Sequence, residues 1–533
     1  MNKYNIILFI LLMSTSINNI ERIDITDKKI LFLGYGGVAK CVWNYFDYYF
    51  IYSLNNVYIV EQYKKALYGP KLNKVKKEHI LVENINSTNF DEIIQKFHFK
   101  QGDIIIDLTY FSNTYFFVNK CLQLGINYIN TSIEDSEDAF LGTSIDYQQL
   151  VIANIFKKFK SDKKNTIRST VLIECGQNPG LIQHYILYAL NELNKIKNNT
   201  TVDDYRMKTL IQSIKQNKVG TILMSEIDNM FLKSKSKSKS KSNNTRKNKT
   251  TKHKLDTIYN TWSVAGLIGE GFDKCELVYG GNNNTFIKPI LSKNLIDQHK
   301  MSLFKEVTDN DYQVLFLKKY GVNAFLNSIC PVLNEDDSIK LEIFKGCLIH
   351  HGEIFELAKL FGKYAPFMSY VYKINKYADE SMIEYFQKNR YDESHDIKQW
   401  ILHHYEQFYV FDNIHKKSEG RIIGHDSIGC TLYCGHKNID NIYWCGTILD
   451  TDSVLLKDFT PTIVQVAAGV LSGLSYMLDS KNKPQGLIYS TDINTPYILQ
   501  KSIPLLGRVF FQEIPKDDFD KEMRVTVRDM FNN

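Results

Sequence analysis

The sequence predicts an α/β protein that begins with a doubly wound parallel sheet and continues into a larger α/β domain. Two observations carry this prediction. Short runs of Ile, Val and Leu recur in the N-terminal third between longer mixed segments, as in buried parallel strands covered by helices. The chain has 533 residues, 44% of them hydrophobic and 23% charged, which is enough for two or three folded domains.

The first domain is predicted strand by strand. The strand beginning at Lys29 leads into a glycine turn and a helix, in the text KILFLGYGGVAKCVWNYF. The next apolar runs are NVYIVE (56–61), DIIIDLT (103–109) and GINYINTS (125–132). This order of strand, helix and strand is typical of a Rossmann-type domain, which we place at residues 23–160.

The rest of the chain is divided by composition. Residues 1–22 form an apolar N-terminal extension, and residues 161–460 form the larger domain, which opens with the strand and turn STVLIECGQNPG. Residues 461–533 form a C-terminal helical segment, and the apolar text from Thr460 to Leu478 predicts a buried helix with Pro461 in its first turn.

The positive charge is concentrated in one segment. The chain has 65 basic and 59 acidic residues, a net charge of +6. Residues 233–254 hold nine Lys, one Arg and no acid, so the remainder has 55 basic and 59 acidic residues, or −4. This low-complexity segment is predicted to be a solvated loop. It contains no aromatic residue for stacking on bases, so we expect no nucleic-acid partner.

The N-terminus and the cysteines bear on the cellular compartment. The apolar run Ile6–Met13 has the outline of a signal peptide but is too short to span a membrane. A cleaved signal and an uncleaved extension both remain open. Nine cysteines, an odd number spread thinly, do not form a disulfide framework and favour a reducing, cytoplasmic location.

The glycine turn is a candidate dinucleotide site. It reads G-x-G-x-x-A between a strand and a helix, a context that favours a pyrophosphate on the helix N-terminus. Glu61 ends the second strand, 22 residues after Ala39, where a carboxylate can bind ribose hydroxyls and repel a 2′-phosphate. NAD is therefore expected over NADP. The predicted cofactor-binding residues are Gly34, Gly36, Gly37, Val38, Ala39, Glu61 and Thr109.

A second set of polar residues lies within apolar text, where an unpaired charge would be costly. His351 and Glu353 are two residues apart, so their side chains would share a face of an extended segment. Cys430, Cys434, His436 and Cys445 suggest zinc, but their spacing is not that of a usual zinc pair, and we interpret them as packed thiols. The polar set is Glu134, Asn178, Glu226, Trp262, Glu270, His351 and Glu353.

The sequence resembles bacterial-type homospermidine synthase, within the saccharopine dehydrogenase-like group. The segments that carry the resemblance run from about residue 21 to 510 and include ECGQNPGL, NTWSVAGLIGEG, HHGEIFELAKLF and HDSIGCTLYCGHKNIDNIYWCGT. The resemblance implies bound NAD, oxidation of putrescine to an imine, attack by a second putrescine with loss of ammonia, and reduction to homospermidine. Spermidine is an alternative aminobutyl donor. A homodimer and a return of the C-terminal segment to the first domain are implied in the same way.

The resemblance also implies roles for the polar set. Catalytic roles fall on Asn178, Trp262, Glu270, His351 and Glu353, and substrate-binding roles on Glu134, Glu226 and Asp426. These residue types suit a dication on a four-methylene stem. Carboxylates bind the ammonium ends, and an indole face attracts a desolvated cation by about 2 kcal/mol. The base that deprotonates the amine is His351 or an adjacent Glu, and the sequence does not choose between them.

Departures from the family pattern leave alternatives open. The basic segment 233–254 is an insertion near the site, the N-terminal extension is extra, and Phe111 stands where the family has an acidic residue. An NAD(P)-dependent dehydrogenase of the saccharopine or carboxyspermidine type is one alternative, but its carboxylated substrates would require arginines near these motifs. A non-catalytic dinucleotide-binding regulator is the other.

Overall fold

The structure is a computed structural model of the whole chain. It describes residues 9–10, 16–110, 113–133, 169–234, 258–272, 274–280, 302–303, 312–320, 325–388, 397–404, 408–410, 420–435, 440–482 and 484–514. Some sequence predictions concern residues outside these ranges, namely those for Phe111, Glu134, His436 and nearly all of the basic segment 233–254.

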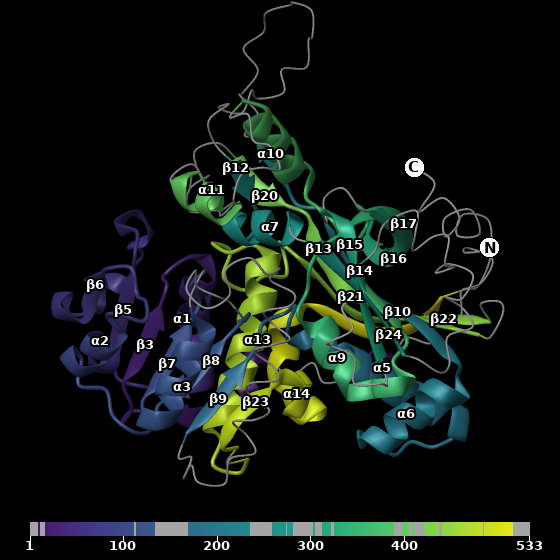
Figure 1. Ribbon diagram of the computed structural model, residues 1–533, viewed down its shortest axis with the longest axis horizontal. Helices are drawn as coiled ribbons and strands as arrows, with labels where there is room; N and C mark the ends of the chain where they lie inside the picture. Colours follow the sequence, from purple (N-terminus) through teal and green to yellow (C-terminus); the bar gives the residue numbers. More distant parts are fainter. Residues whose placement is uncertain are drawn as a thin grey trace, which may run out of the picture.

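A seven-stranded parallel sheet forms the first part of the molecule (Figure 1). Its spatial order is β6 (Ile80–Val82), β5 (Val57–Glu61), β3 (Ile30–Leu33), β7 (Ile104–Asp107), β8 (Asn127–Asn130), β9 (Thr170–Ile173) and β23 (Gly486–Tyr489). The chain order reverses between β3 and β7, which is where doubly wound sheets bind ligands at the carboxyl ends of their strands. The predicted α/β fold class is confirmed.

Each face of this sheet is covered by helices because its strands are apolar on both sides. Ile30 and Phe32 of β3 belong to a core shared with α1 (Gly37–Tyr49) and α13 (Pro461–Leu478). Leu31 and Leu33 belong to the opposite core. That core is completed by α2 (Phe90–Lys96) and α3 (Thr114–Leu124).

A larger mixed sheet of eleven strands forms the second part of the molecule. Its central strands β10 (Val219–Asp228) and β18 (Phe367–Lys373) are parallel, and β10 is antiparallel to β21 (His425–Cys434) on its other side. The other strands are β1 (Phe9–Ile10), β13 (Lys274–Gly280), β14 (Ser302–Leu303), β15 (Tyr312–Tyr320), β16 (Phe325–Leu333), β17 (Ile339–Leu348), β22 (Asn441–Asp450) and β24 (Arg508–Ile514).

Further helices and short strand pairs complete the fold. The helices are α5 (Leu181–Asn198), α6 (Met207–Gln216), α7 (Val264–Gly271), α9 (Glu353–Phe361), α10 (Lys376–Lys388), α11 (Ile397–His404) and α14 (Thr495–Leu506). Three strand pairs lie outside both large sheets: β11 (Phe231–Ser234) with β20 (Gly420–Ile423), β12 (Ile258–Asn260) with β19 (Phe408–Val410), and β2 (Ile23–Asp24) with β4 (Phe50–Ile51).

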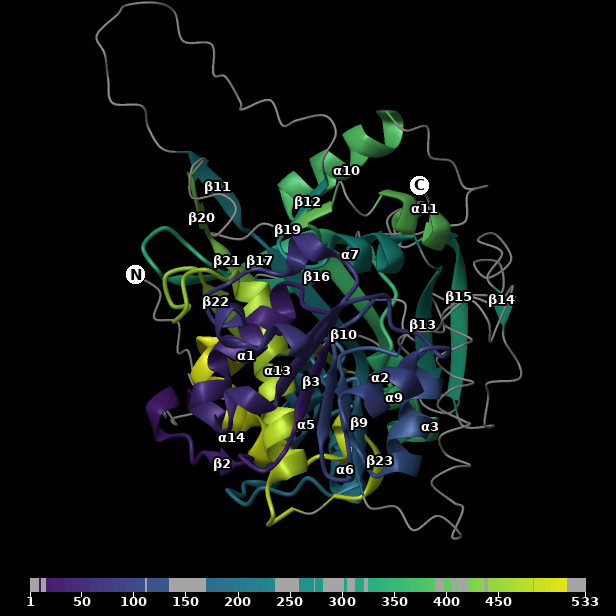
Figure 2. The same ribbon diagram turned by 90° about the vertical axis from the view of Figure 1, so that its left-hand side faces the viewer.

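The helix α13 lies between the two sheets. It packs against α1 and α14, and Figures 1 and 2 show it running through the middle of the molecule. Thr460 caps it by accepting from the Ile463 N–H, and Pro461 stands in its first turn as predicted. Among the described helices it alone is long and apolar enough to cross a membrane, and 83% of its apolar window is buried inside the protein.

The predicted boundary at residue 160 stays a prediction. Strand β9 follows that boundary, yet it pairs with β8 in the first sheet, and β23 extends the same sheet from near the C-terminal end of the described chain. Strand β9 from the middle of the chain and strand β23 from its C-terminal part therefore belong to the same sheet as the N-terminal strands.

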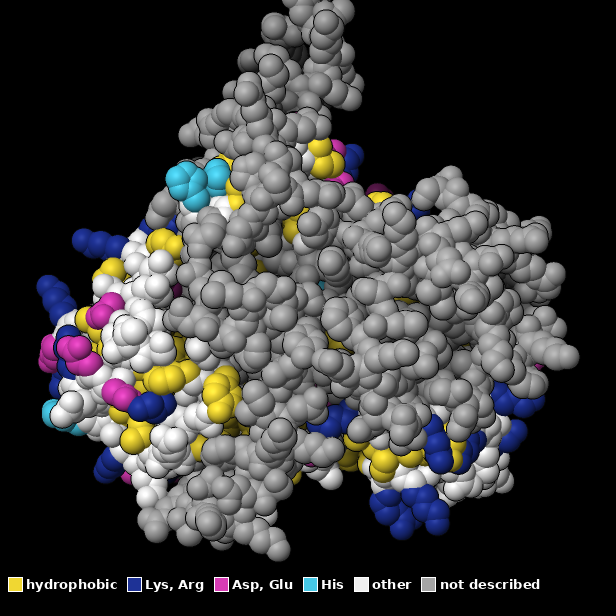
Figure 3. All heavy atoms as spheres, in the orientation of Figure 1, with side chains coloured by type: hydrophobic (Ala, Val, Ile, Leu, Met, Phe, Trp, Pro, Cys, Tyr) yellow, Lys and Arg dark blue, Asp and Glu magenta, His cyan; other side chains and the backbone are white. Residues whose placement is uncertain are grey.

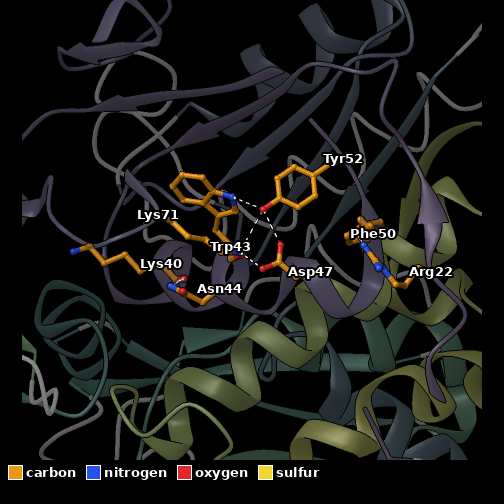
Figure 4. Close-up of polar contacts among 8 residues, drawn as sticks. All are labelled: Arg22, Lys40, Trp43, Asn44, Asp47, Phe50, Tyr52 and Lys71. Atoms are coloured by element: carbon orange, nitrogen blue, oxygen red, sulfur yellow. Dashed lines mark hydrogen bonds and ion pairs between the residues drawn. The ribbon is translucent and has the colours of Figure 1, made fainter. Parts of the chain in front are cut away.

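A polar cluster formed by Trp43, Asp47, Tyr52 and Lys71 ties the segment after β5 to α1 (Figure 4). The half-buried Lys71 Nζ donates to the Trp43 carbonyl at 2.6 Å, contacts Tyr52 Oη at 3.3 Å and pairs with Asp47 at 2.9 Å. Burial lowers the pKa of Lys71. The segment is thereby held where it borders the site described below.

The described surface carries both signs of charge. On the face shown in Figure 3, basic and acidic side chains are mixed over the first domain, and Lys and Arg side chains gather near α6. A mixed surface of this kind is typical of a globular protein.

Candidate active site

Two adjoining cavities of about 200 Å³ each lie at the carboxyl edge of the parallel sheet. The first, the glycine-turn cavity, is lined by Gly34, Gly36, Glu61 and neighbouring residues of β5 and of the segments that follow β3 and β7. The second, the carboxylate cavity, is lined by Asn178, Glu226, Glu270, His351 and neighbouring residues of the mixed sheet. The residues common to both are Val38, Leu108, Thr109, Tyr110, Trp262 and Ser263, so the cavities are continuous.

The glycine turn has the geometry that the motif requires. Gly34 adopts φ +77°, and a Cβ there would come within 2.8 Å of the Leu108 carbonyl oxygen. Gly36 caps α1, and a Cβ on it would meet nothing within 4 Å, so its backbone faces open space. The helix N-terminus with its unpaired N–H groups therefore opens on the cavity, which fits a pyrophosphate.

Glu61 holds the glycine turn as well as facing the cavity. Its Oε2 accepts from the Tyr35 N–H at 2.5 Å, and its Oε1 accepts from the Tyr63 N–H at 2.8 Å. An ionised carboxylate accepts about four hydrogen bonds, so capacity remains for ribose hydroxyls. The sequence predicted that Glu61 binds ribose hydroxyls, but it did not indicate that Glu61 holds the glycine turn.

Thr109 lies where the two cavities join. Its N–H and Oγ1 donate to Asp107 Oδ1 at 3.1 and 2.5 Å, and Tyr128 Oη donates to Asp107 Oδ2 at 2.6 Å. The buried Asp107 therefore fixes the loop that follows β7, which carries Thr109 into contact with both cavities.

Asn178 enters the carboxylate cavity from a tight turn after β9. Gly180 adopts φ +136°, and a Cβ there would lie 2.0 Å from the Gly176 carbonyl oxygen, so the turn requires glycine. The Asn178 Nδ2 donates to Tyr370 Oη at 2.6 Å and to Glu226 Oε2 at 3.3 Å. The predicted strand-to-helix turn thus aims its amide at a carboxylate.

Glu226 lies near the end of β10 and is 4% exposed. Burial raises its pKa to about 8, against the opposing effect of the hydrogen bond from Tyr370. Asp228 follows on the same face of β10, and Asp426 lies opposite Asp228 on β21. Burial also raises the pKa of Asp426 well above its usual range, and Thr462 donates to Asp426 Oδ2 at 2.6 Å.

Trp262 stands at the junction of the two cavities. Its Nε1 donates to Tyr372 Oη at 3.3 Å. Gly266 leaves room for the indole, since a Cβ at that position would come within 2.6 Å of the ring. Ser263 caps α7 by accepting from the Gly266 N–H at 3.0 Å, which fixes the turn that carries Trp262.

His351 lies between two carboxylates. Its Nδ1 is 3.3 Å from Glu353 Oε2, and its Nε2 is 3.6 Å from Glu270 Oε2. Burial alone would lower the pKa of His351, but the two carboxylates outweigh burial and raise that pKa. Its ring stacks on Tyr370 with centroids 3.8 Å apart.

The extended segment predicted for His351 and Glu353 is wrong. Gly352 caps α9 and Glu353 is the first residue of that helix, so the two side chains meet across a helix start. Glu353 is completely buried behind His351 and does not line the carboxylate cavity. His350 does line it, beside His351, and its N–H donates to the Glu270 carbonyl at 3.4 Å.

Comparisons with known proteins show which families and folds this chain is similar to. Residues 30–154 match the family described as the saccharopine dehydrogenase NADP binding domain. A homospermidine synthase from Mesorhizobium japonicum is 25% identical over 406 residues, 73% of this chain and 70% of that protein. A homospermidine synthase from Blastochloris viridis is 20% identical over 91% of this chain and 90% of that protein.

The resemblance to the homospermidine synthases is confirmed. The crystal structure of the homospermidine synthase from Legionella pneumophila in complex with NAD has the same fold. It superposes with a TM-score of 0.69 at 19% identity, and 92% of each chain is covered.

Most residues assigned from the homospermidine synthase pattern come together in the structure. Five of them line the carboxylate cavity: Asn178, Glu226, Trp262, Glu270 and His351. Two more lie directly behind its wall, Glu353 against His351 and Asp426 against Thr462. Glu134 lies outside the described residues.

Sequence reasoning missed three buried residues of the site. Tyr370 and Tyr372 alternate on β18, and both contact predicted residues. Asp228 accepts from Thr261 Oγ1 at 2.5 Å, next to Trp262 in the chain. The tyrosines belong to the apolar run FMSYVYK, which is typical of a core strand, so no signal distinguished them.

Proposed function

We propose that this protein is an NAD-dependent homospermidine synthase. In this reaction the primary amine of putrescine, or the aminobutyl group of spermidine, is oxidised to an imine. The amine of a second putrescine attacks the imine carbon. Ammonia leaves when putrescine is the donor, 1,3-diaminopropane leaves when spermidine is the donor, and reduction of the new imine gives homospermidine. The similarity to two homospermidine synthases over most of the chain supports the proposal.

The charge of the carboxylate cavity is the observation that carries the proposal. Glu226 and Glu270 line it, Trp262 adds an aromatic face, and the described lining includes no lysine or arginine. Carboxylates and an indole attract ammonium groups, and a described lining without lysine or arginine offers no permanent cation to bind a substrate carboxylate. A diamine fits this cavity, whereas a saccharopine-type substrate does not.

The glycine-turn cavity fits NAD. The open backbone at Gly36 and the start of α1 would hold the pyrophosphate, and Glu61 would bind the adenosine ribose and repel a 2′-phosphate. When bound, NAD supplies the acceptor and then the donor of the hydride. The continuity of the two cavities beside Trp262 supports hydride transfer at that junction.

His351 is the proposed base. An amine must lose its proton before it can lose a hydride, and the His351 Nε2 faces the cavity side at Glu270. Glu353 would stabilise the imidazolium that forms, because its carboxylate is 3.3 Å from the other ring nitrogen. Glu226 and Glu270 would hold the ammonium ends, and Trp262 would face the cationic carbon and nitrogen of the iminium.

A homodimeric assembly and a cytoplasmic location complete the proposal. The resemblance supports a homodimer. The eight cysteines whose side chains are described are all free thiols, which supports a reducing compartment such as the cytoplasm.

The proposal is tested by product analysis. Purified protein is incubated with NAD and putrescine, or with putrescine and spermidine, and amines and ammonia are measured by mass spectrometry and an ammonia assay. We expect homospermidine, with one ammonia released per turnover from putrescine alone. If neither homospermidine nor ammonia formed under any of these conditions, the proposal would be wrong.

A pair of variants locates the activity. Glu226→Gln removes a charge from the cavity wall and should abolish most homospermidine formation while leaving NAD bound. Glu342→Gln removes a carboxylate from a half-exposed ion pair with Lys373 outside both cavities and should not change turnover. Equal activity of the two variants would remove Glu226 from the proposed site.

A further inference from the structure

Two tyrosines of β18 underlie the carboxylate cavity. Tyr370 and Tyr372 are two residues apart on one strand, so their side chains point to the same side of the sheet. Both are buried, at 0% and 1% exposure. Each hydroxyl contacts a residue that the sequence assigned to the site, Tyr372 with Trp262 and Tyr370 with Asn178.

Tyr370 contacts more of the predicted site residues than Tyr372 does. Its hydroxyl donates to Glu226 Oε2 and accepts from Asn178 Nδ2 at 2.6 Å. Its ring stacks on His351 with an interplanar angle of 21° and centroids 3.8 Å apart. One side chain thereby contacts an amide, a carboxylate and an imidazole of the same cavity.

The contacts have a direct electrostatic consequence. A hydroxyl donor stabilises the ionised form of Glu226, which burial disfavours. Within the part of the chain that the structure describes, the other titratable groups whose charges act on Glu226 are acids, and Tyr370 and Asn178 supply its hydrogen-bond donors. These acids are Asp228 on the same strand, Asp426 on β21, Glu270 on α7, Tyr372 on β18 and Cys330 on β16.

We propose that Tyr370 is a positioning residue that favours the ionised form of Glu226 and aims its carboxylate at a substrate ammonium while it fixes the plane of His351. This inference rests on the proposed diamine substrate. The phenol does not line the cavity, so it acts through Glu226 and His351 rather than by contact with the substrate.

The variant Tyr370→Phe separates the two halves of this role. It keeps the ring on His351 and removes the donor to Glu226. We expect the KM for putrescine to rise about tenfold, with kcat changed much less, because one hydrogen bond to a charged group is lost. We also expect the acid limb of the pH profile of kcat/KM to move to higher pH, since Glu226 loses its donor.

A matched control removes a buried phenol elsewhere. Tyr49 Oη donates to the Lys501 carbonyl at 2.7 Å, outside both cavities. Tyr49→Phe therefore costs a buried hydrogen bond of similar kind, and it should leave the KM and the acid limb where they are in the unmodified protein. A variant Tyr370→Phe that behaves like this control would overturn the inference.

Two further measurements keep the inference testable apart from turnover. Calorimetric binding of putrescine to the NAD-loaded protein across pH should show the same shift in Tyr370→Phe, and it reports on the cavity even if no homospermidine forms. In a Glu226→Gln background, Tyr370→Phe should weaken binding no further. An additional loss of full size in that background would contradict action through Glu226.

A second substitution covers the case in which Tyr370→Phe does not fold. Replacement of Tyr370 by 3-fluorotyrosine keeps the ring and the hydroxyl and makes the hydroxyl a stronger donor. The acid limb should then move to lower pH. An unmoved limb would count against the proposed role.

Discussion

Trp262 lines both cavities, and in the proposed function it lies where the cofactor and the amine would meet. Its indole is held from two directions, by the Nε1 contact with Tyr372 and by the cap of Ser263 on α7. Asp228 adds a third support, because it accepts from Thr261 at 2.5 Å. The orientation of one aromatic ring therefore depends on a strand, a helix cap and a buried carboxyl group.

Substitutions of Trp262 test the aromatic contact. Trp262→Ala should lower kcat/KM for homospermidine formation about 30-fold, because a desolvated cation–π contact contributes about 2 kcal/mol. Trp262→Phe keeps an aromatic face and should retain part of that activity. Bound NAD should stay near one equivalent in both. Unchanged turnover in Trp262→Ala would exclude the cation–π role.

At the scale of elements, the positions of the parallel strands in the sequence were predictable. Which strands pair with each other in the sheet was predictable only in part. The strand beginning at Lys29 and the runs NVYIVE, DIIIDLT and GINYINTS form β3, β5, β7 and β8, because continuous apolar runs between helices leave few alternatives. The pairing of β23 with β9 joins residues more than 300 positions apart, and no local pattern specifies it.

Most residues of the carboxylate cavity were predictable from the sequence, but the local structure around Glu353 and the role of Tyr370 were not. Asn178, Glu226, Trp262, Glu270 and His351 were found because polar residues in apolar text are conspicuous, and they line one cavity. The helix start at Glu353 was missed, since the spacing of two residues also suits an extended segment. Tyr370 was missed because a tyrosine in a buried strand looks like ordinary core.

The contact between α1 and the segment after β5 gives a prediction about an element. Lys71→Met removes the donor to the Trp43 carbonyl and to Tyr52, and it should lower the free energy of unfolding by about 1–3 kcal/mol. Because that segment borders the glycine-turn cavity, NAD affinity should fall as well. Thermal unfolding and NAD titration measure the two effects.

The control for this prediction is Lys77→Met, on the exposed part of the same segment. It should change neither the unfolding temperature nor NAD binding. If Lys71→Met were indistinguishable from Lys77→Met, the cluster of Figure 4 would have no role in holding the segment.

At the scale of the whole molecule, burial of carboxyl groups sets how stability depends on pH. Burial raises the pKa of Glu226 to about 8 and that of Glu356 to about 7, and His351 also has a raised pKa beside its carboxylates. A group whose pKa is higher in the folded state binds its proton more tightly there. Stability from such groups is lost as pH rises towards the folded pKa.

The pH window can be stated from these groups. His184 and His425 have lowered pKa values, of about 3 and 4, so both are neutral in the folded state across this range. In the unfolded state each is half protonated at about pH 6.5 and nearly neutral by about pH 7.5, so their opposing effect is confined to the start of the window. Between about pH 6.5 and 8.5 the ligand-free protein should lose several degrees of unfolding temperature.

Putrescine should reverse much of that loss, since a bound dication stabilises the ionised carboxylates. The Glu226→Gln variant should show a flatter profile than the unmodified protein. An unfolding temperature that rises over this window would contradict the protonation states described for the cavity.

The fate of the hydride tests the central claim most directly. Putrescine deuterated at both terminal carbons is incubated with the protein and NAD, and the product is analysed by mass spectrometry. If the hydride removed from the donor amine returns to the same bound intermediate, the homospermidine formed retains every deuterium of both putrescines. Homospermidine that has lost one deuterium, or deuterium found in free NADH, would show a release of reducing equivalents that contradicts the account.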